Sequence, residues 1–309
     1  MTLSVILCAH NPREGYLSRA LGALRAQTLP LTEWEFLLVD NASVAPLAER
    51  FDVSWHPRGR HVREDEFGLT PARLRGIRET SGELIVFVDD DNVLAPDYLA
   101  SAKDIAHNWP RLGAWGGHIE GEFETVPAEW TRQYLEYICV RPCGAAQWSN
   151  NADDWSSQPA GAGLCVRRVV ATRYRERLDG DVLRRMLGRN GASLMSGEDI
   201  DLVHCALELD LGFGRFPELK LTHLISAGRL EESYLLRLVR SVSCSSALLG
   251  ALRGKPVRLP SAGLLAQLSD LKLLLESGRR ALRFRQQQKQ GVREAARILS
   301  KIETSPIPD

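Results

Sequence analysis

Apolar stretches of strand length alternate with segments of helical periodicity over the first hundred residues. Residues 3–8, 34–39 and 84–88 are such stretches. Leu17, Leu21 and Leu24 recur at the spacing of one helix face between the first two, and Thr70-Pro71 is a helix start signal before the third. This order predicts an α/β fold with a mixed, mostly parallel central sheet that is flanked by helices.

Each of these three predicted strands ends in polar residues. In open α/β sheets, ligands bind at the carboxyl ends of the strands, which the topology brings to one edge. The chain therefore has a predicted ligand site at this edge. The residues concerned are, in chain order, Cys8, Ala9, His10, Asp40, Asn41, Asp89, Asp90 and Asp91.

The third strand ends in three consecutive carboxylates, which repel one another unless a cation or protons neutralise them. Strand alternation turns Asp89 and Asp91 to one side and Asp90 to the other. Such a pair suits Mg²⁺ or Mn²⁺, which takes its remaining ligands from water and a substrate diphosphate. The chain has neither GxxxxGK[ST] nor GxGxxG. A bound metal is therefore expected to hold the phosphates.

Composition points to a soluble globular protein of the cytoplasm. No run of 18 uninterrupted apolar residues occurs, so no transmembrane helix is expected, and the N-terminus lacks the basic region of a signal peptide. The six cysteines are scattered and are expected to be mostly buried free thiols in a reducing compartment.

The net charge of zero hides a strong asymmetry. Residues 233–301 carry 14 Lys and Arg against three acidic residues, a net charge of +11, and residues 1–232 carry −9. Leucines at helical spacing continue through the basic part, notably over residues 264–275. These helices either pack on the catalytic domain or a second subunit, as in a homodimer, or contact an anionic membrane surface peripherally. Nucleic acid binding is not expected, because few aromatic residues and no reading motif accompany the charge.

Five segments together resemble the family 2 glycosyltransferases of the GT-A fold. They are "LSVILCAHNP", "ALRAQTLPLTEWEFLLVDNAS", "GLTPARLRGIRETSGELIVFVDDDN", "PAGAGLCVRR" and "SGEDIDL", in the family's order and spacing. The resemblance implies a catalytic domain over residues 1–230 that binds a nucleotide sugar. Residues 231–309 then form a helical C-terminal extension.

The resemblance also assigns roles to the strand-end residues. Cys8, Ala9 and His10 would line the base, Asp40 or Asn41 would bond the base or ribose, and Arg73 in "PARLRG" matches a nucleotide-contacting arginine. The three aspartates match the family's DXD motif. Asp91 is the better metal ligand, Asp89 and Asp90 lie at the diphosphate, and His223 is a further candidate ligand.

The "SGEDIDL" segment carries the expected catalytic pair. An inverting transfer needs one carboxylate to take the proton of the attacking acceptor hydroxyl. The resemblance gives this role to Asp199, while Glu198 orients the acceptor. Gly163, with its neighbour Gly161, would allow close approach of backbone to the acceptor or sugar, and one of Trp148 and Trp155 would form a stacking platform.

The sequence thus predicts a metal-dependent, inverting glycosyltransferase of bacterial polysaccharide or cell-envelope synthesis. It would use a nucleoside-diphosphate sugar, with UDP favoured, and a glycan or lipid-linked hydroxyl acceptor. A sugar nucleotidyltransferase is an alternative, although the expected Gly-rich loop does not follow the first strand. A degenerate transferase-like binding subunit is a second alternative, against which the intact Asp89, Asp91 and Asp199 argue.

Overall fold

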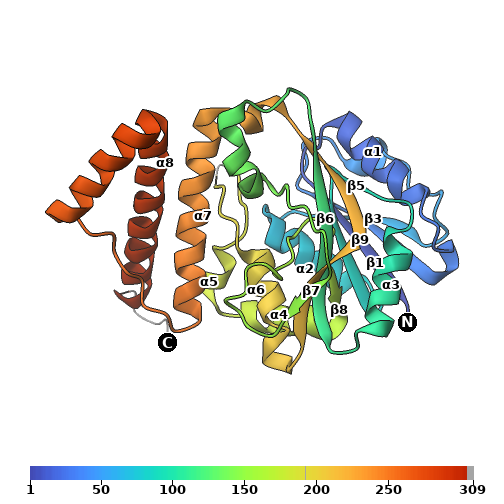
Figure 1. The fold of residues 1–309 in the computed structure, drawn as a ribbon. Helices are drawn as coiled ribbons and strands as arrows, with labels where there is room; N and C mark the ends of the chain where they lie inside the picture. Colours follow the sequence, from blue (N-terminus) through green and yellow to red (C-terminus); the bar gives the residue numbers. More distant parts are fainter. Residues whose placement is uncertain (192, 305–309) are drawn as a thin grey trace.

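A computed structural model describes residues 1–191 and 193–304, and within them nine strands form one central sheet (Figure 1). The predicted α/β class, with a mixed sheet and C-terminal helices, is confirmed. The strands are β1 (Leu3–Ala9), β2 (Trp34–Asn41), β3 (Gly59–Glu64), β4 (Leu84–Asp89), β5 (Asn92–Leu94), β6 (Leu112–Phe123), β7 (Gln147–Ser149), β8 (Cys165–Arg167) and β9 (Gly212–Ile225).

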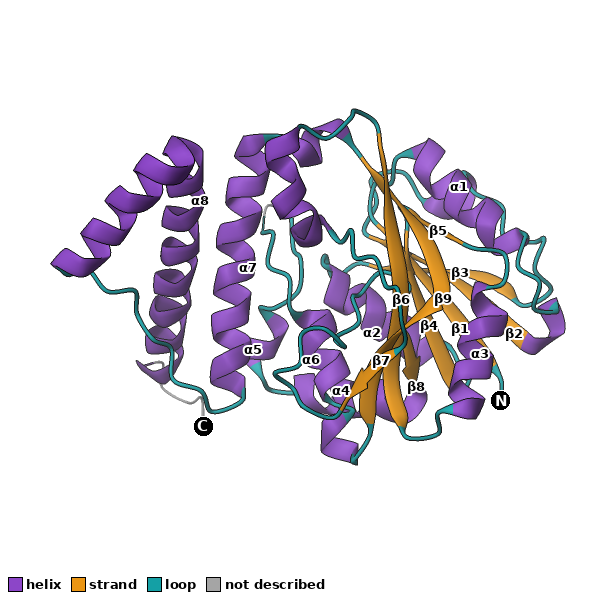
Figure 2. Cartoon of the chain, in the orientation of Figure 1, coloured by secondary structure: helices purple, strands orange, loops and turns teal. Residues whose placement is uncertain are grey.

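Helices cover both faces of the sheet (Figure 2). Helices α1 and α3 pack their apolar sides on one face, and α2, α4 and α6 pack on the other. The helices are α1 (Glu14–Arg25), α2 (Leu69–Glu79), α3 (Tyr98–Asn108), α4 (Arg168–Leu178), α5 (Val182–Arg185), α6 (Glu198–His204), α7 (Glu232–Leu252) and α8 (Leu264–Thr304), with short 3₁₀ segments that include Glu129–Ile138 and Ala227–Leu230.

The strand order is β3-β2-β1-β4-β8-β6-β9-β5, with β7 added beside β9. The first four strands in this order are parallel, and β8 is antiparallel to both of its neighbours. The parallel register pairs Cys8 with Val39 and with Asp89. The ends of β1, β2 and β4 therefore lie at one edge, as predicted.

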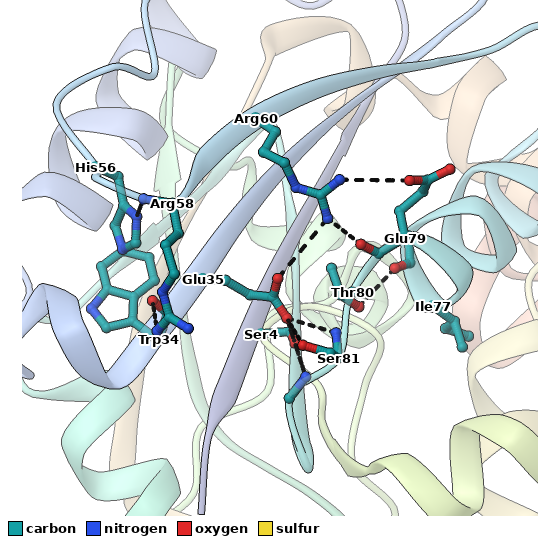
Figure 3. A network of polar contacts seen from close by, with 12 residues as sticks. Ser4, Trp34, Glu35, His56, Arg58, Arg60, Ile77, Glu79, Thr80 and Ser81 are labelled. Atoms are coloured by element: carbon teal, nitrogen blue, oxygen red, sulfur yellow. Dashed lines mark hydrogen bonds and ion pairs between the residues drawn. The ribbon is translucent and has the colours of Figure 1, made fainter.

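A polar network fixes the opposite, amino end of these strands (Figure 3). Glu35 accepts hydrogen bonds from the Ser4 hydroxyl (2.8 Å) and from the backbone amides of Ser81 (2.7 Å) and Gly82 (3.1 Å). These bonds tie the turn that leads into β4 to β1 and β2. Since a shift of β4 by one residue would break them, they help to set which residues reach the carboxyl edge.

Helix α7 lies against the part of the chain that carries the sheet on one side and against α8 on the other (Figure 1). By length and composition it is the one helix in the described residues that is apolar enough to cross a membrane. Its leucines are buried against residues 134–140 and the second part of α8, and this packing accounts for its composition.

Helix α8 consists of two helices that meet at Gly278, whose φ of 79° only glycine adopts readily. The two parts form a hairpin, in which the Lys289 ammonium binds the Asp270 carboxylate (2.6 Å). The basic second part packs on α7 through Phe284 and Ala295. The prediction that the basic helices pack on the rest of the chain is thus confirmed for the second part of α8. The apolar side of this helix is covered and is not available to a membrane.

All six cysteines lie in the described part of the chain and are free, and all except the half-buried Cys139 are buried. The predicted free thiols are confirmed.

Candidate active site

A cavity of about 620 Å³ opens at the carboxyl edge of the sheet. This volume is within the range of ligand pockets. Nine separate stretches of the chain line it, and α7 contributes Val242 and Ser246 to its wall. The sequence-predicted residues that it brings together are Cys8, Ala9, His10, Asn41, Arg73, Asp89, Asp90, Asp91, Trp155, Glu198, Asp199 and His223.

The three consecutive carboxylates at the end of β4 are neutralised in three different ways. Asp89 lies 3.4 Å from the Arg73 guanidinium. Burial and the two neighbouring carboxylates raise the pKa of Asp90 to about 8, so that a proton neutralises it near pH 7. Burial would also raise the pKa of Asp91, but the charges of His223 and Arg229 outweigh it and lower that pKa to about 2. Asp91 is thus ionised, and the neighbouring positive charges balance it.

Asp91 and His223 are the residues best placed to hold a divalent metal. The Asp91 Oδ2 and His223 Nε2 atoms are 3.2 Å apart, close to the separation of about 3 Å between adjacent ligands of an octahedral ion with bonds of about 2.1 Å. The buried His223 Nδ1 has no hydrogen-bond partner among the described residues. The Arg229 guanidinium lies 3.2 Å from the same Asp91 oxygen and 2.9 Å from His223 Nε2, so it contacts both candidate ligand atoms and would have to move for a metal to bind them.

The protein supplies only part of a metal coordination sphere. Across residues 1–191 and 193–304, no cluster of three or more His, Cys, Asp or Glu side chains is arranged to hold a metal. The pair Asp91–His223 fits Mg²⁺ or Mn²⁺ provided that water and substrate phosphates complete the sphere, which is the common arrangement for these ions. Asp89 is turned toward Arg73 and is less well placed as a ligand.

Arg73 joins three of the motifs from the centre of the site. Its guanidinium donates to Glu198 Oε1 (2.9 Å) and to the Gly161 carbonyl (3.3 Å), approaches Asp89, and lies over the Phe87 ring. The side chain is buried, so Arg73 is not a surface residue of its helix. Its nucleotide contact stays a prediction, but most of its donors are already used within the protein.

Glu198 and Asp199 begin α6 and face the cavity together. The Gly161 amide donates to Asp199 Oδ2 (2.8 Å), and a Cβ at Gly161 would lie only 3.0 Å from that oxygen. Burial, and then the Asp199 charge, raise the pKa of Glu198 to about 7, although Arg73 opposes the shift. Helix α7 supports this turn, since the Ser196 amide donates to the Ser245 hydroxyl (3.0 Å).

The predicted nucleotide-binding residues are only partly at the cavity. Cys8 lines it as a neutral thiol, because burial raises its pKa to about 12. His10 is exposed and packs on Phe67, with ring centroids 4.4 Å apart. Asn41 reaches the cavity wall. The Asp40 carboxylate does not, because it accepts from the amides of Ser43 and Leu47 on the other side of β2.

Asn41 is held by the loop that leads to α2. Its amide group donates to the carbonyls of Glu64 and Glu66, and its Oδ1 accepts from the Gly68 amide (2.9 Å). These bonds use both donor hydrogens of its side chain. Asn41 therefore shapes the cavity wall by fixing the loop of residues 64–68.

Of the two tryptophans predicted to stack on a sugar, the structure places only one at the cavity. Trp155 lines the cavity, donates to Glu136 (2.8 Å) and stacks under Arg141. Trp148 lies on β7 outside the cavity, so Trp155 is the one of the two tryptophans that is placed at the site.

Gly163 is also outside the cavity. Its φ of 67° and the Tyr98 hydroxyl, 2.4 Å from where a Cβ would stand, require glycine for packing. Gly161 is the glycine of this segment that approaches the site.

Arg189 is a site residue that the sequence reasoning missed. It lines the cavity, and its charge acts on Asp89, Asp91 and Glu198. Among the described residues its side chain has no hydrogen-bond or ion-pair partner. The segment around it has no periodicity, and Arg189-Asn190-Gly191 reads as an ordinary turn, so no local signal identified it.

Comparison with known proteins agrees with this geometry. A family model described as glycosyl transferase family 2 matches residues 4–157. Glycosyltransferase AglE of Haloferax volcanii is 30% identical over 92 residues, which is 29% of this chain and 30% of AglE. The glucosyl-dolichyl phosphate glucuronosyltransferase of the same organism is 24% identical over 145 residues, covering 45% of this chain and 42% of the relative. The chain thus matches well under half the length of these relatives.

A solved structure shows the same fold over nearly the whole chain. Residues 1–349 of Staphylococcus aureus TarS in complex with UDP-GlcNAc have a TM-score of 0.51 and 15% sequence identity, with 96% of this chain and 92% of that chain covered. At this identity the match shows the fold alone. Residues 4–157 are therefore similar to the family 2 glycosyltransferases, and the chain has a fold of the GT-A type.

Proposed function

We propose that the protein transfers a sugar, with inversion, from a nucleoside-diphosphate donor to a hydroxyl of a glycan or lipid-linked acceptor in polysaccharide or cell-envelope synthesis. The main support for this proposal is that one cavity combines Asp199, the Asp91–His223 pair and the cationic Arg189. A UDP-type donor is favoured because TarS, whose fold this chain shares, is described in complex with UDP-GlcNAc. The free thiols support a cytoplasmic setting.

In this proposal each group of residues has one task. Asp199, fixed by the Gly161 amide, takes the proton of the acceptor hydroxyl as its oxygen attacks the anomeric carbon. Arg189 attracts the diphosphate, and Arg229 adds positive charge beside Asp91. A divalent metal held by Asp91 and His223 would supply charge neutralisation for the departing nucleoside diphosphate. Trp155 offers a face on which a sugar ring can stack.

The family match favours glycosyl transfer over the alternative of nucleotidyl transfer. The degenerate binding subunit remains the competing hypothesis. It predicts donor binding without turnover, and Asp199 is the residue that separates the two.

Metal removal is expected to abolish turnover. EDTA should stop release of nucleoside diphosphate from the donor, and Mn²⁺ or Mg²⁺ should restore it. Binding can also be measured independently of activity, because bound Mn²⁺ no longer contributes to the EPR signal of the free ion. When Mn²⁺ is titrated into protein with UDP, this signal should fall strongly for the wild type and much less for Asp91→Asn. The matched control is Asp104→Asn, an exposed carboxylate on α3. Equal Mn²⁺ binding by Asp91→Asn and wild type would count against this metal site.

Arg189→Gln is expected to weaken donor binding by about 10-fold or more, since a hydrogen bond to a charged group contributes roughly 1.5–3 kcal/mol. The loss should be larger for UDP than for uridine, because uridine has no phosphates. Calorimetric titration of both ligands measures it, with the exposed Arg175→Gln on α4 as the control. If UDP and uridine lose affinity equally, Arg189 does not bind the diphosphate.

A further inference from the structure

The first part of α8 carries an uncovered row of leucines at the outer edge of the molecule. Figure 1 shows this part, in orange-red, standing away from α7 while the second part lies along it. The side chains concerned are between 51% and 83% exposed. We call them the leucine face: Leu264, Leu265, Leu268, Leu271 and Leu275.

These five leucines lie on one side of the helix. At 100° per residue they fall within an arc of about 120°, the width of the apolar stripe of an amphipathic helix. The opposite side is held by the second part of α8, through Ser269 with Arg285 (2.8 Å) and Asp270 with Lys289. These polar contacts fix the helix so that the leucine face points outward.

Basic residues precede and follow the helix that carries the leucine face. Residues 253–301 carry 12 Lys and Arg against three acidic residues, a net charge of +9. Arg258 and Arg279, just before and after this helix, are exposed and have no ion-pair partner in the described ranges 1–191 and 193–304. An occupant of opposite charge therefore fits this surface. A second copy of the chain would bring two such basic regions together.

We propose that the leucine face docks the protein on the anionic headgroup layer of a lipid bilayer. Exposed apolar patches of this kind mark interaction sites, and a leucine face rimmed by arginine matches the two attractions that hold interfacial helices. The membrane contact is thus assigned to the helix before Gly278. The basic helix after Gly278 is not assigned this contact, because its apolar side is covered. This assignment does not rest on the proposed function, because the test needs neither donor nor acceptor.

The test is co-sedimentation of the full-length protein with vesicles of neutral lipid, and of neutral lipid with 30% anionic lipid, over a salt series. The leucine variant replaces Leu264, Leu268, Leu271 and Leu275 by Gln. The control replaces Val44 and Val126, which are exposed valines on distant loops, by Gln. Circular dichroism and melting establish that the variants are folded.

The wild type and the valine control should bind the anionic vesicles, and this binding should weaken as the salt concentration rises. The leucine variant should bind at least about 10-fold more weakly than the wild type. Arg258→Gln with Arg279→Gln should weaken binding about fivefold for each residue at low salt. This charge variant leaves the leucine face intact, so it tests the proposal even if the leucine variant fails to fold. Absence of wild-type binding, or equal binding by the leucine variant, would overturn the proposal. A concentration-dependent dimer that the leucine variant loses, without vesicle binding, would show that a second copy covers the face.

Discussion

Replacing Asp199 by asparagine is expected to lower turnover by about 10²–10⁴-fold, the usual effect of losing a general base. The substitution keeps the shape of the side chain, and its Oδ1 can still accept from the Gly161 amide. Donor affinity should therefore stay within about twofold of wild type. The measurement is the steady-state rate of nucleoside diphosphate release, with donor affinity taken from a separate titration.

Two comparisons make this result specific. Asp104→Asn, far from the cavity, should leave both quantities unchanged. Glu198→Gln should raise the acceptor KM more than it lowers kcat, if Glu198 orients the acceptor. The assignment of Asp199 is wrong if Asp199→Asn turns over normally at saturating donor. Retention of the anomeric configuration in the product would exclude the single-displacement reaction itself.

Arg73→Met is expected to destabilise the fold by about 3–5 kcal/mol, because it removes one partner of a buried ion pair. The Glu198 carboxylate would be left buried without its counter-charge, 4% exposed. The pKa of Glu198, already raised to about 7 by burial, should rise further. The protonated form is neutral and less costly to bury, so the loss should be smaller at pH 5.5 than at pH 8.

Urea unfolding at these two pH values measures the effect. The control is Arg75→Met on the same helix, which removes a half-exposed pair with Glu79 and should cost about 1 kcal/mol or less. Arg73→Lys should recover part of the stability but not the paired contacts to Glu198 and Gly161. If Arg73→Met is as stable as wild type and loses only donor affinity, Arg73 is a nucleotide contact instead.

The sequence was sufficient for the features that depend on strand direction. Parallel strands with polar ends predicted that Cys8, Asn41 and Asp89 would meet, and the register of β1 with its neighbours brings them together. Side-chain alternation also separates Asp40 from Asn41. Successive side chains of a strand point to opposite faces of the sheet. Asn41 therefore lines the cavity while Asp40 lies on the other face.

Features that depend on packing between distant segments could not be predicted. Arg189 lies in a turn with no pattern, and only the fold brings it beside the aspartates. The buried ion pairs of Arg73 could not be predicted because its partners are 16 and 125 positions away. Val242 of α7 likewise lines the cavity from a helix that the sequence assigned to a separate extension. The division into residues 1–230 and 231–309 stays a prediction.

The most direct measurement is a titration of UDP and GDP, each with and without Mn²⁺, against wild type, Asp91→Asn and Arg189→Gln. Saturable binding of at least one diphosphate at one site per chain, strengthened by Mn²⁺ and weakened in both variants, is the predicted result. The matching nucleotide sugar should then release nucleoside diphosphate in the presence of wild type and not of Asp199→Asn. Failure of both diphosphates to bind, or binding that neither the metal nor the two variants change, would contradict the assignment of this cavity as a nucleotide-sugar site.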